Sequence, residues 1–304
     1  MTVELPPAWA DEIRSLPAEG GASGREWLDR LPRLVDECVQ QWDLAVTGAP
    51  WTGHTAIVFP AERDGIPLVL KVGWPHPESA AEHLALRHWG GRGAVSLIAA
   101  DPARGALLLE RLDPSRTLAS VPIDRACEVA GALLARLHVT APPTIPQLGS
   151  MIERWVGPLA HAEGLPRRMV SRTESLAGEL LRDTSPPKLL HGDLHFDNVL
   201  ASKNVLASKR AEWLAIDPKP YAGQPGWEVH ALLRNRVEEL RAAASFRAAV
   251  RRRLEIVAEA AGIDPDTARH WSLVHTGIQA GWAAAASEKD ATSLNIALFK
   301  ALED

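Results

Sequence analysis

The stretch HGDLHFDNVL, at residues 191–200, places polar side chains between short apolar segments. Its polar residues are His191, Asp193, His195, Asp197 and Asn198. The letters KLL precede the stretch and VL ends it, which indicates a loop held at both ends by short buried strands. Polar groups held close to a protein core need defined partners, so this loop is expected to carry fixed polar chemistry.

The composition is typical of a globular protein. The chain has 304 residues, of which 46% are hydrophobic and 23% charged. Its formal net charge of -5 offers no basic surface to a nucleic acid, so we expect a small cationic partner instead. Cys38 and Cys127 are too few and too far apart in sequence for a disulfide framework or a zinc site. No apolar run approaches the roughly 18 residues of a membrane span, and no signal peptide is evident. We expect a cytoplasmic monomer.

Two parts with different secondary structure are expected along the chain. Residues 22–45 carry apolar side chains at helical spacing. Short apolar segments, a helix near 77–90 and a hairpin with a tight turn at Pro102 to Gly105 then predict five antiparallel strands and one helix. The later sequence has mainly helical periodicity. We predict an α+β fold with a strand-rich lobe at 1–112, which includes a helical extension at 1–42, and a mainly helical lobe at 113–304.

Lys71 is the only lysine in the first 187 residues, and it lies in the apolar segment PLVLKVGW. Lysine provides a compact, mobile ammonium that suits phosphate oxygens. Glu78 and Glu82 lie one turn apart in the next predicted helix, and either can pair with Lys71. The helix phase favours Glu82, because Leu86 continues the same face toward the sheet. The alternative is a strand-end lysine with its ammonium in solvent.

A second carboxylate, Asp217, ends the apolar segment WLAID downstream of the polar loop. Asn198 and Asp217 together offer hard oxygen ligands, which suit Mg²⁺ bound to nucleotide phosphates. Asp193 is then left to face the acceptor hydroxyl, which is the attacking group. A lysine, an amide and two carboxylates meet the needs of phosphoryl transfer, in which the protein mainly positions groups and neutralises charge. Zinc catalysis fits less well because HEXXH and paired cysteines are absent, and no GXSXG serine elbow exists.

The segments that carry these residues resemble those of a known family. They are Lys71, Glu82, HGDLHFDN and IDP, in this order over most of the chain. They resemble the aminoglycoside phosphotransferases, small-molecule kinases with a protein-kinase-like two-lobe fold. The longer stretches LLLERLDPSRTLASV, LHGDLHFDNVLAS and WLAIDPKPYAGQPGWEVHALLRNR are similar to the streptomycin 6-kinase and hydroxyurea kinase branch.

The resemblance implies a role for each matching position. Asp193 is then the catalytic base, Asn198 and Asp217 are the magnesium ligands, and Lys71, held by Glu82, contacts the phosphates of ATP. The adenine is expected at backbone groups near Leu109, Glu110 and Arg111, and the phosphates near the turn that contains Thr52 and Gly53. Gly192 and Pro218 stand where protein kinases have arginine and phenylalanine, which argues against control by phosphorylation of an activation loop.

The sequence defines the acceptor less well than it defines the chemistry. Glu228, Trp227 and His195 are candidate acceptor contacts, with Glu228 close behind the segment GQPGW. The predicted function is transfer of the γ-phosphoryl group of ATP, with Mg²⁺, to a hydroxyl of an aminoglycoside such as streptomycin. Hydroxyurea or another small hydroxylated metabolite is an alternative acceptor. A nucleotide-binding scaffold without catalysis is an alternative of another class.

Overall fold

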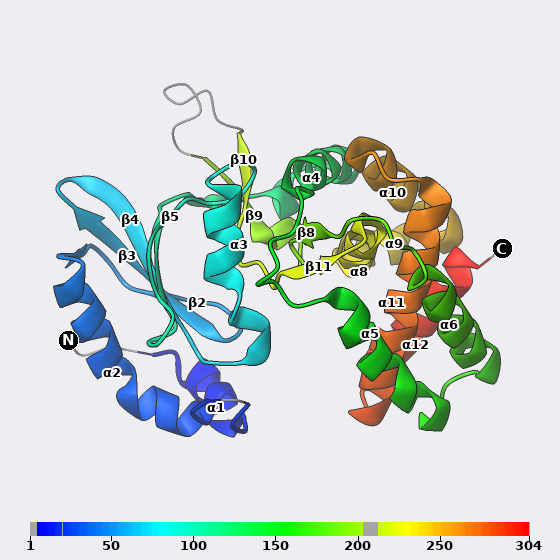
Figure 1. The fold of residues 1–304 in the computed structure, drawn as a ribbon, viewed down its shortest axis with the longest axis horizontal. Helices are drawn as coiled ribbons and strands as arrows, with labels where there is room; N and C mark the ends of the chain where they lie inside the picture. Colours follow the sequence, from blue (N-terminus) through cyan, green and yellow to red (C-terminus); the bar gives the residue numbers. More distant parts are fainter. Residues whose placement is uncertain (1–4, 20, 203–211, 304) are drawn as a thin grey trace.

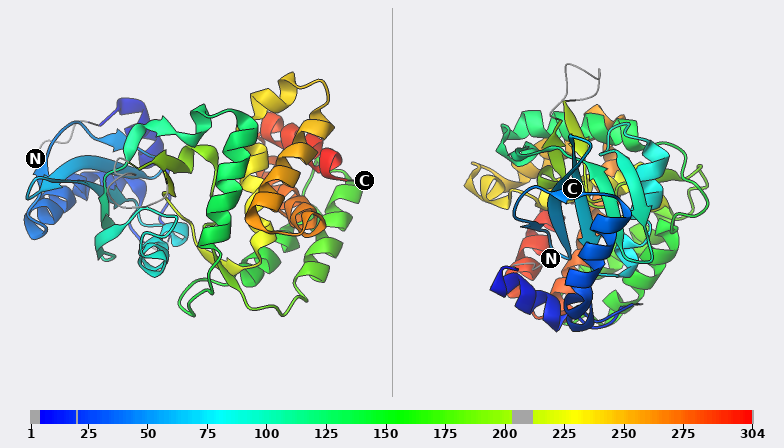
Figure 2. Two further views of the ribbon diagram at one scale, coloured as in Figure 1. Left: turned by 90° about the horizontal axis from the view of Figure 1, so that it is seen from above. Right: turned by 90° about the vertical axis from the view of Figure 1, so that its left-hand side faces the viewer.

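A computed structural model of the chain describes residues 5–19, 21–202 and 212–303. A strand-rich part formed by the earlier residues lies beside a helical part formed by the later ones (Figure 1). The view from above shows the same arrangement (Figure 2). The predicted α+β fold, with its strands before its helices, is therefore confirmed.

The strand-rich part begins with two helices, α1 (Pro7–Ser15) and α2 (Gly24–Gln41). Helix α2 starts at a capping box, in which Ser23 accepts from the backbone of Glu26 and the Glu26 side chain accepts from the backbone of Ser23. Its buried stripe is the one that the spacing of residues 22–45 predicts. The helix continues through Pro32 and ends a few residues earlier than expected.

A six-stranded antiparallel sheet follows, one strand more than predicted. The strand order is β1-β3-β4-β6-β5, with β2 paired to β3. The strands are β1 (Ala45–Val46), β2 (Trp51–Thr52), β3 (Ala56–Arg63), β4 (Ile66–Gly73), β5 (Leu97–Asp101) and β6 (Ala106–Glu110). The predicted hairpin with its turn at Pro102 to Gly105 is formed by β5 and β6. Between β4 and β5, the expected helix is a 3₁₀ turn, η1 (Pro77–Ser79), followed by α3 (Glu82–Trp89).

Alternation along β4 sends side chains to opposite faces of this sheet. Leu68, Leu70 and Val72 belong to a hydrophobic cluster shared with α1 and α2. Val69 and the β6 residues Leu107 and Leu109 pack in the larger cluster on the other face, which includes α3 and the helical part. Lys71 has the same parity as Val69, so it projects toward α3 and not toward α2.

Two short sheets and a 3₁₀ turn support the polar loop. Strand β8 (Lys188–Leu190) pairs with β11 (Tyr221–Gly223), and β9 (Val199–Ala201) pairs with both β10 (Trp213–Ala215) and β7 (Asp113–Thr117). Strand β7 was not predicted, because the segment DPSRT is polar. The loop between β8 and β9 ends in a 3₁₀ turn, η4 (Phe196–Asn198). The proposed lobe boundary at residue 112 falls between β6 and β7.

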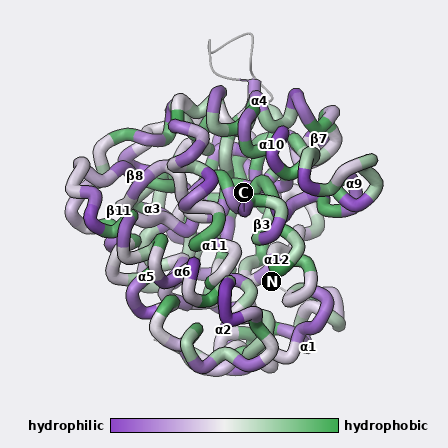
Figure 3. Tube along the Cα trace, turned by 90° about the vertical axis from the view of Figure 1, so that its right-hand side faces the viewer, coloured by the Kyte–Doolittle hydropathy of each residue, from purple (hydrophilic) through white to green (hydrophobic). Residues whose placement is uncertain are grey.

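The remaining elements of the described residues are helices and 3₁₀ turns. Helix α4 packs along α10, and α11 packs on α12 and α6. Hydrophobic segments run through the middle of this part beside α11 (Figure 3). No helix in the described ranges is long and apolar enough to cross a membrane. The helices and 3₁₀ turns are η2 (Leu118–Ser120), α4 (Ile123–Leu137), α5 (Leu148–Val156), η3 (Gly157–His161), α6 (Arg167–Leu180), η5 (Pro225–Glu228), α8 (Val229–Arg234), α9 (Val237–Ala242), α10 (Phe246–Ala261), α11 (Pro265–Ala285) and α12 (Lys289–Leu302).

Candidate active site

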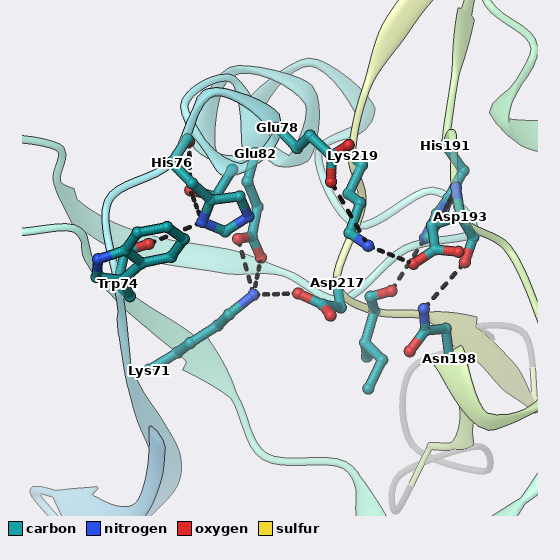
Figure 4. A network of polar contacts seen from close by, with 12 residues as sticks. Lys71, Trp74, His76, Glu78, Glu82, His191, Asp193, Asn198, Asp217 and Lys219 are labelled. Carbon is teal, nitrogen blue, oxygen red and sulfur yellow. Dashed lines mark hydrogen bonds and ion pairs between the residues drawn. The ribbon is translucent and has the colours of Figure 1, made fainter. Parts of the chain in front are cut away.

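Lys71 lies at the centre of an ion-pair cluster between the sheet and the helical part. Its Nζ is 2.7 Å from both carboxylate oxygens of Glu82 and 2.5 Å from Oδ1 of Asp217 (Figure 4). Glu82 stands at the first position of α3 and is 5% exposed. The structure thus pairs Lys71 with Glu82 and not with Glu78, as the helix phase indicates.

The pKa values in this cluster follow from burial and charge. Burial alone would lower the pKa of Lys71, but the charges of Asp217 and Glu82 outweigh it and raise that pKa. Burial raises the pKa of Glu82 to about 7, although the ammonium of Lys71 opposes the shift. The charge of Lys71 holds the pKa of Asp217 at about 2. Lys71 is therefore a permanent cation, and Asp217 is a permanent anion at neutral pH.

Asp217 occupies an unusual backbone conformation two residues after the end of β10. Its φ of 56° lies in the left-handed region, which few residues other than glycine adopt and which aspartate tolerates better than most. Its side chain is 49% exposed, with Oδ1 on Lys71. Residues held in such conformations cluster at functional sites.

Asn198 is held in place through its amide nitrogen. Its Nδ2 donates to the backbone oxygen of Asp193 at 2.9 Å, which leaves the amide oxygen free of that contact. The residue is 8% exposed, at the end of η4. Together, this oxygen and the half-exposed carboxylate of Asp217 are the hard donors that Mg²⁺ prefers, so the residues fit the predicted ion. No group of three or more His, Cys, Asp or Glu side chains suited to a metal occurs in the parts of the chain that the structure describes.

His191 fixes the polar loop to the segment that carries Asp217. Its ring lies 3.0 Å from the backbone oxygen of Ile216 through Nε2 and stacks on Trp89 with centroids 6.1 Å apart. Burial lowers the pKa of His191 to about 4, so the ring is neutral at physiological pH. It acts as a buried strut.

Asp193 is partly exposed, and its carboxylate has a partner that the sequence analysis missed. Lys219 Nζ lies 2.9 Å from Oδ2 of Asp193 and 3.8 Å from Oε2 of Glu78 (Figure 4). The signal was present, because Lys219 follows Asp217 by two residues in the segment IDPKP and lysine is scarce in this chain. Glu78, considered as a partner for Lys71, instead faces Lys219.

The structure buries Glu228 and Trp227, which were predicted to contact the acceptor. Glu228 is 2% exposed and accepts from the backbone N–H groups of His191 and Gly192. Burial raises its pKa to about 7, against the effect of those two hydrogen bonds. Trp227 is equally buried and stacks on His275 at a centroid distance of 3.8 Å. Glu228 thus supports the loop from within, and Trp227 packs against aromatic side chains of the helical part. An acidic residue close to a motif in sequence can face either the ligand or the backbone, and the sequence does not distinguish these cases.

His195, the third predicted acceptor contact, remains near the loop surface. Its Nδ1 is 3.4 Å from Oδ2 of Asp197, and its side chain is 29% exposed. Asp197 is the more exposed partner and also accepts from Asn235 at 3.1 Å. Of the three predicted contacts, His195 is thus the one that the structure leaves accessible.

The residues predicted to bind the nucleotide lie on the sheet. At the end of β6, the Glu110 carboxylate accepts from the backbone of Ser96, and the Glu110 N–H donates to the Ser96 oxygen at 3.1 Å. That N–H is therefore not available to adenine, whereas the neighbouring backbone of Leu109 and Arg111 remains the predicted contact. The guanidinium of Arg111 lies 5.6 Å from the ring of Trp51.

The turn with Thr52 and Gly53 is exposed and is braced by the N-terminal extension. The Gly53 N–H donates to Ala56 across the turn, and the Gly53 oxygen accepts from Nε1 of Trp9 at 2.7 Å. Trp9 belongs to α1, so this helix contacts the turn expected near the phosphates. The sequence predicted a helical extension here but not this contact.

Comparison with known proteins agrees with this geometry. The sequence profile of the aminoglycoside/hydroxyurea antibiotic resistance kinases matches residues 41–287. The chain belongs to this family. It is 38% identical over 281 residues to streptomycin 6-kinase of Streptomyces glaucescens, covering 89% of this chain and 87% of that one. It is 40% identical over 266 residues to hydroxyurea phosphotransferase of Kitasatospora aureofaciens, covering 84% and 73%. The resemblance inferred from the motifs is thus confirmed.

A solved structure shows the same fold. A thermostable mutant of aminoglycoside phosphotransferase APH(4)-Ia, in ternary complex with AMP-PNP and hygromycin B, superposes with a TM-score of 0.57 at 14% identity. The match covers 90% of this chain and 97% of that one. The protein-kinase-like architecture expected of this kinase family is therefore confirmed.

Proposed function

We propose that this protein is an ATP- and magnesium-dependent kinase that phosphorylates a hydroxyl of an aminoglycoside such as streptomycin. The observation that carries the proposal is the convergence of two groups of residues. Lys71, Glu82 and Asp217 form one cluster, and Asp193 lies on the neighbouring loop whose backbone oxygen orients Asn198. Phosphoryl transfer needs these two functions, charge neutralisation and alignment of the hydroxyl.

Each of the site residues has a defined part in the proposed reaction. Lys71 contacts the nucleotide phosphates, and Glu82 keeps its ammonium in place. Asn198 and Asp217 hold the magnesium ion, which supplies positive charge at the phosphates when it is bound. Asp193 orients the acceptor hydroxyl and accepts its proton. The exposed turn at Thr52 and Gly53 covers the phosphates, and the end of β6 binds the adenine.

Two observations support a cationic acceptor. The chain carries a formal net charge of -5, and carboxylates outnumber ammonium groups around Asp193. The identity to a streptomycin 6-kinase over most of both chains agrees with such a substrate. In that case the enzyme confers antibiotic resistance by O-phosphorylation. The similar identity to a hydroxyurea phosphotransferase favours hydroxyurea as the second acceptor to test.

The test is a transfer assay with the full chain, ATP and Mg²⁺, across streptomycin, other aminoglycosides, hydroxyurea and simple amino sugars. We expect phosphorylated streptomycin by mass spectrometry and the highest kcat/KM for an aminoglycoside. Asp193→Asn should reduce kcat by about 10²–10⁴-fold with nearly unchanged ATP affinity, because general-base catalysis contributes about that much. A wild-type protein that binds MgATP but phosphorylates no acceptor would support the scaffold alternative.

A further inference from the structure

Lys219 is a second cation at the site, and its surroundings differ from those of Lys71. The side chain of Lys71 is 12% exposed and is enclosed by Glu82 and Asp217, whereas that of Lys219 is 33% exposed. Its ammonium lies on Oδ2 of Asp193, with Glu78 on the other side (Figure 4). Lys219 is therefore a partly exposed cation next to the proposed base.

The backbone of Lys219 is fixed against the loop that carries Asp193. Its N–H donates to the backbone oxygen of His191 at 2.8 Å. Its own backbone oxygen lies so close to Gly192 that a Cβ added there would meet it at 1.9 Å. Gly192 also has a φ of 82°, so glycine is required by both conformation and space. The ammonium and the Asp193 carboxylate are thus attached to two segments that are locked together.

The chemistry of the transfer offers an anionic partner for this ammonium. The transferring phosphoryl group carries negative charge on its equatorial oxygens as it passes from nucleotide to acceptor. It must come within reach of the acceptor oxygen that Asp193 orients, and the Lys219 ammonium lies 2.9 Å from that carboxylate.

We propose that Lys219 is a catalytic residue whose ammonium binds the γ-phosphoryl group during transfer, with Asp193 and Glu78 as its counter-ions before the nucleotide binds. The inference rests on the proposed kinase function. In the step, the acceptor O–H bond breaks and its proton goes to Asp193. The acceptor oxygen bonds to the γ-phosphorus while the bond from that phosphorus to the bridging oxygen breaks, and the electron pair stays on the nucleoside diphosphate. Lys219 remains an ammonium throughout.

The test compares Lys219→Gln and Lys219→Arg with Lys289→Gln, which removes the same charge from an exposed position on α12. Steady-state kinetics with ATP and streptomycin, and ATP hydrolysis without acceptor, would be measured for each variant. We expect Lys219→Gln to lower both rates by a similar factor of about 10²–10³, the usual loss when a group that stabilises transition-state charge is removed. Lys219→Arg should recover part of the rate, affinity for MgADP should stay unchanged, and Lys289→Gln should behave as wild type.

A second experiment, in the Asp193→Asn variant, distinguishes two roles for Lys219: contact with the phosphoryl group and positioning of Asp193. In Asp193→Asn, a lysine that acts only through that carboxylate has nothing left to position. Lys219→Gln should then cause no further loss if it is a positioning residue, whereas the proposal expects a further loss of at least tenfold in residual transfer. Wild-type kcat in a folded Lys219→Gln protein, or no further loss in the Asp193→Asn background, would overturn the inference alone. A wild-type protein without transfer or ATP hydrolysis would instead overturn the proposed function, and the inference with it.

Discussion

Replacement of Glu228 by alanine tests whether this buried carboxylate supports the loop or contacts the acceptor. The side chain accepts from the backbone N–H groups of His191 and Gly192, at a site that is 2% exposed. Each buried N–H left without an acceptor costs about 1–3 kcal/mol. Because Gly192 is partly exposed and water can replace part of its loss, we expect the free energy of unfolding to fall by about 2–4 kcal/mol.

The same substitution should reduce turnover more than nucleotide binding. Asp193 directly follows the two backbone groups that Glu228 holds, and a misplacement of about 1 Å at a reacting group can cost about 10²-fold in rate. Lys71 and Glu82 lie on β4 and α3 and should be unaffected, so the KM for ATP should change little. We therefore expect kcat to fall by about 10²-fold in Glu228→Ala.

Glu228→Gln is the matched control. Both N–H groups lie within hydrogen-bonding distance of the same carboxylate oxygen, Oε1, which an amide oxygen can replace. We expect a loss of less than about 1.5 kcal/mol in unfolding free energy, the usual contribution of one hydrogen bond, and largely preserved turnover. Urea denaturation and steady-state kinetics on the three proteins measure these effects. Unchanged stability and kcat in Glu228→Ala, with a raised KM for the acceptor only, would refute the support role and return Glu228 to the acceptor site.

Three further predictions concern other parts of the structure. Trp9→Phe should raise the KM for ATP by up to about tenfold in steady-state assays, because one hydrogen bond to Gly53 contributes about 0.5–1.5 kcal/mol; an unchanged KM would mean that α1 does not support the turn. Lys71→Ala and Glu82→Gln should each impair kcat/KM for ATP and be less than additive when combined, and strict additivity would contradict their acting as a pair. His275, whose pKa burial lowers to about 3, is neutral in the folded protein, so stability is complete above about pH 6.5 and is lost as the pH falls toward 3. Between pH 7.5 and 5, the free energy of unfolding of His275→Phe, measured by urea denaturation, should therefore fall by about 2 kcal/mol less than that of the wild type. An equal fall in the two proteins would contradict this.

The features that follow local periodicity could be predicted from the sequence. Alternation along PLVLKV places Lys71 on the face of β4 opposite α2, and the phase of α3 brings Glu82 rather than Glu78 to its ammonium. The order of elements and the hairpin of β5 and β6 likewise follow from apolar spacing and from turn residues. Strand β7 could not be predicted, because its pairing with β9 depends on the backbone while its side chains are polar.

The parts of the site that escaped prediction depend on contacts between a side chain and a distant backbone. Glu228 binds backbone N–H groups 36 and 37 residues away, and every residue type except proline carries such a group. Such a contact leaves no pattern in side-chain chemistry. Trp9 is similar, because its partner is the backbone oxygen of Gly53. Lys219 can be recognised in the sequence as a lysine beside a motif. The direction of its side chain, however, depends on how closely its backbone approaches Gly192.

The charges of the site bear on the choice between the two acceptors. Lys71 and Lys219 are surrounded by four carboxylates, those of Glu82, Asp217, Asp193 and Glu78. In the proposed assignment, Lys71 lies with Glu82 and Asp217 at the nucleotide side, whereas Asp193 and Glu78 lie at the acceptor side, where both contact the ammonium of Lys219. If that ammonium turns to the phosphoryl group as proposed, the acceptor side keeps an excess of negative charge during transfer. Opposite charges attract more strongly where water is partly excluded, so a guanidinium- or amine-bearing sugar gains from this excess and neutral hydroxyurea does not. The same lysine that assists the transfer would in this way also favour a cationic acceptor.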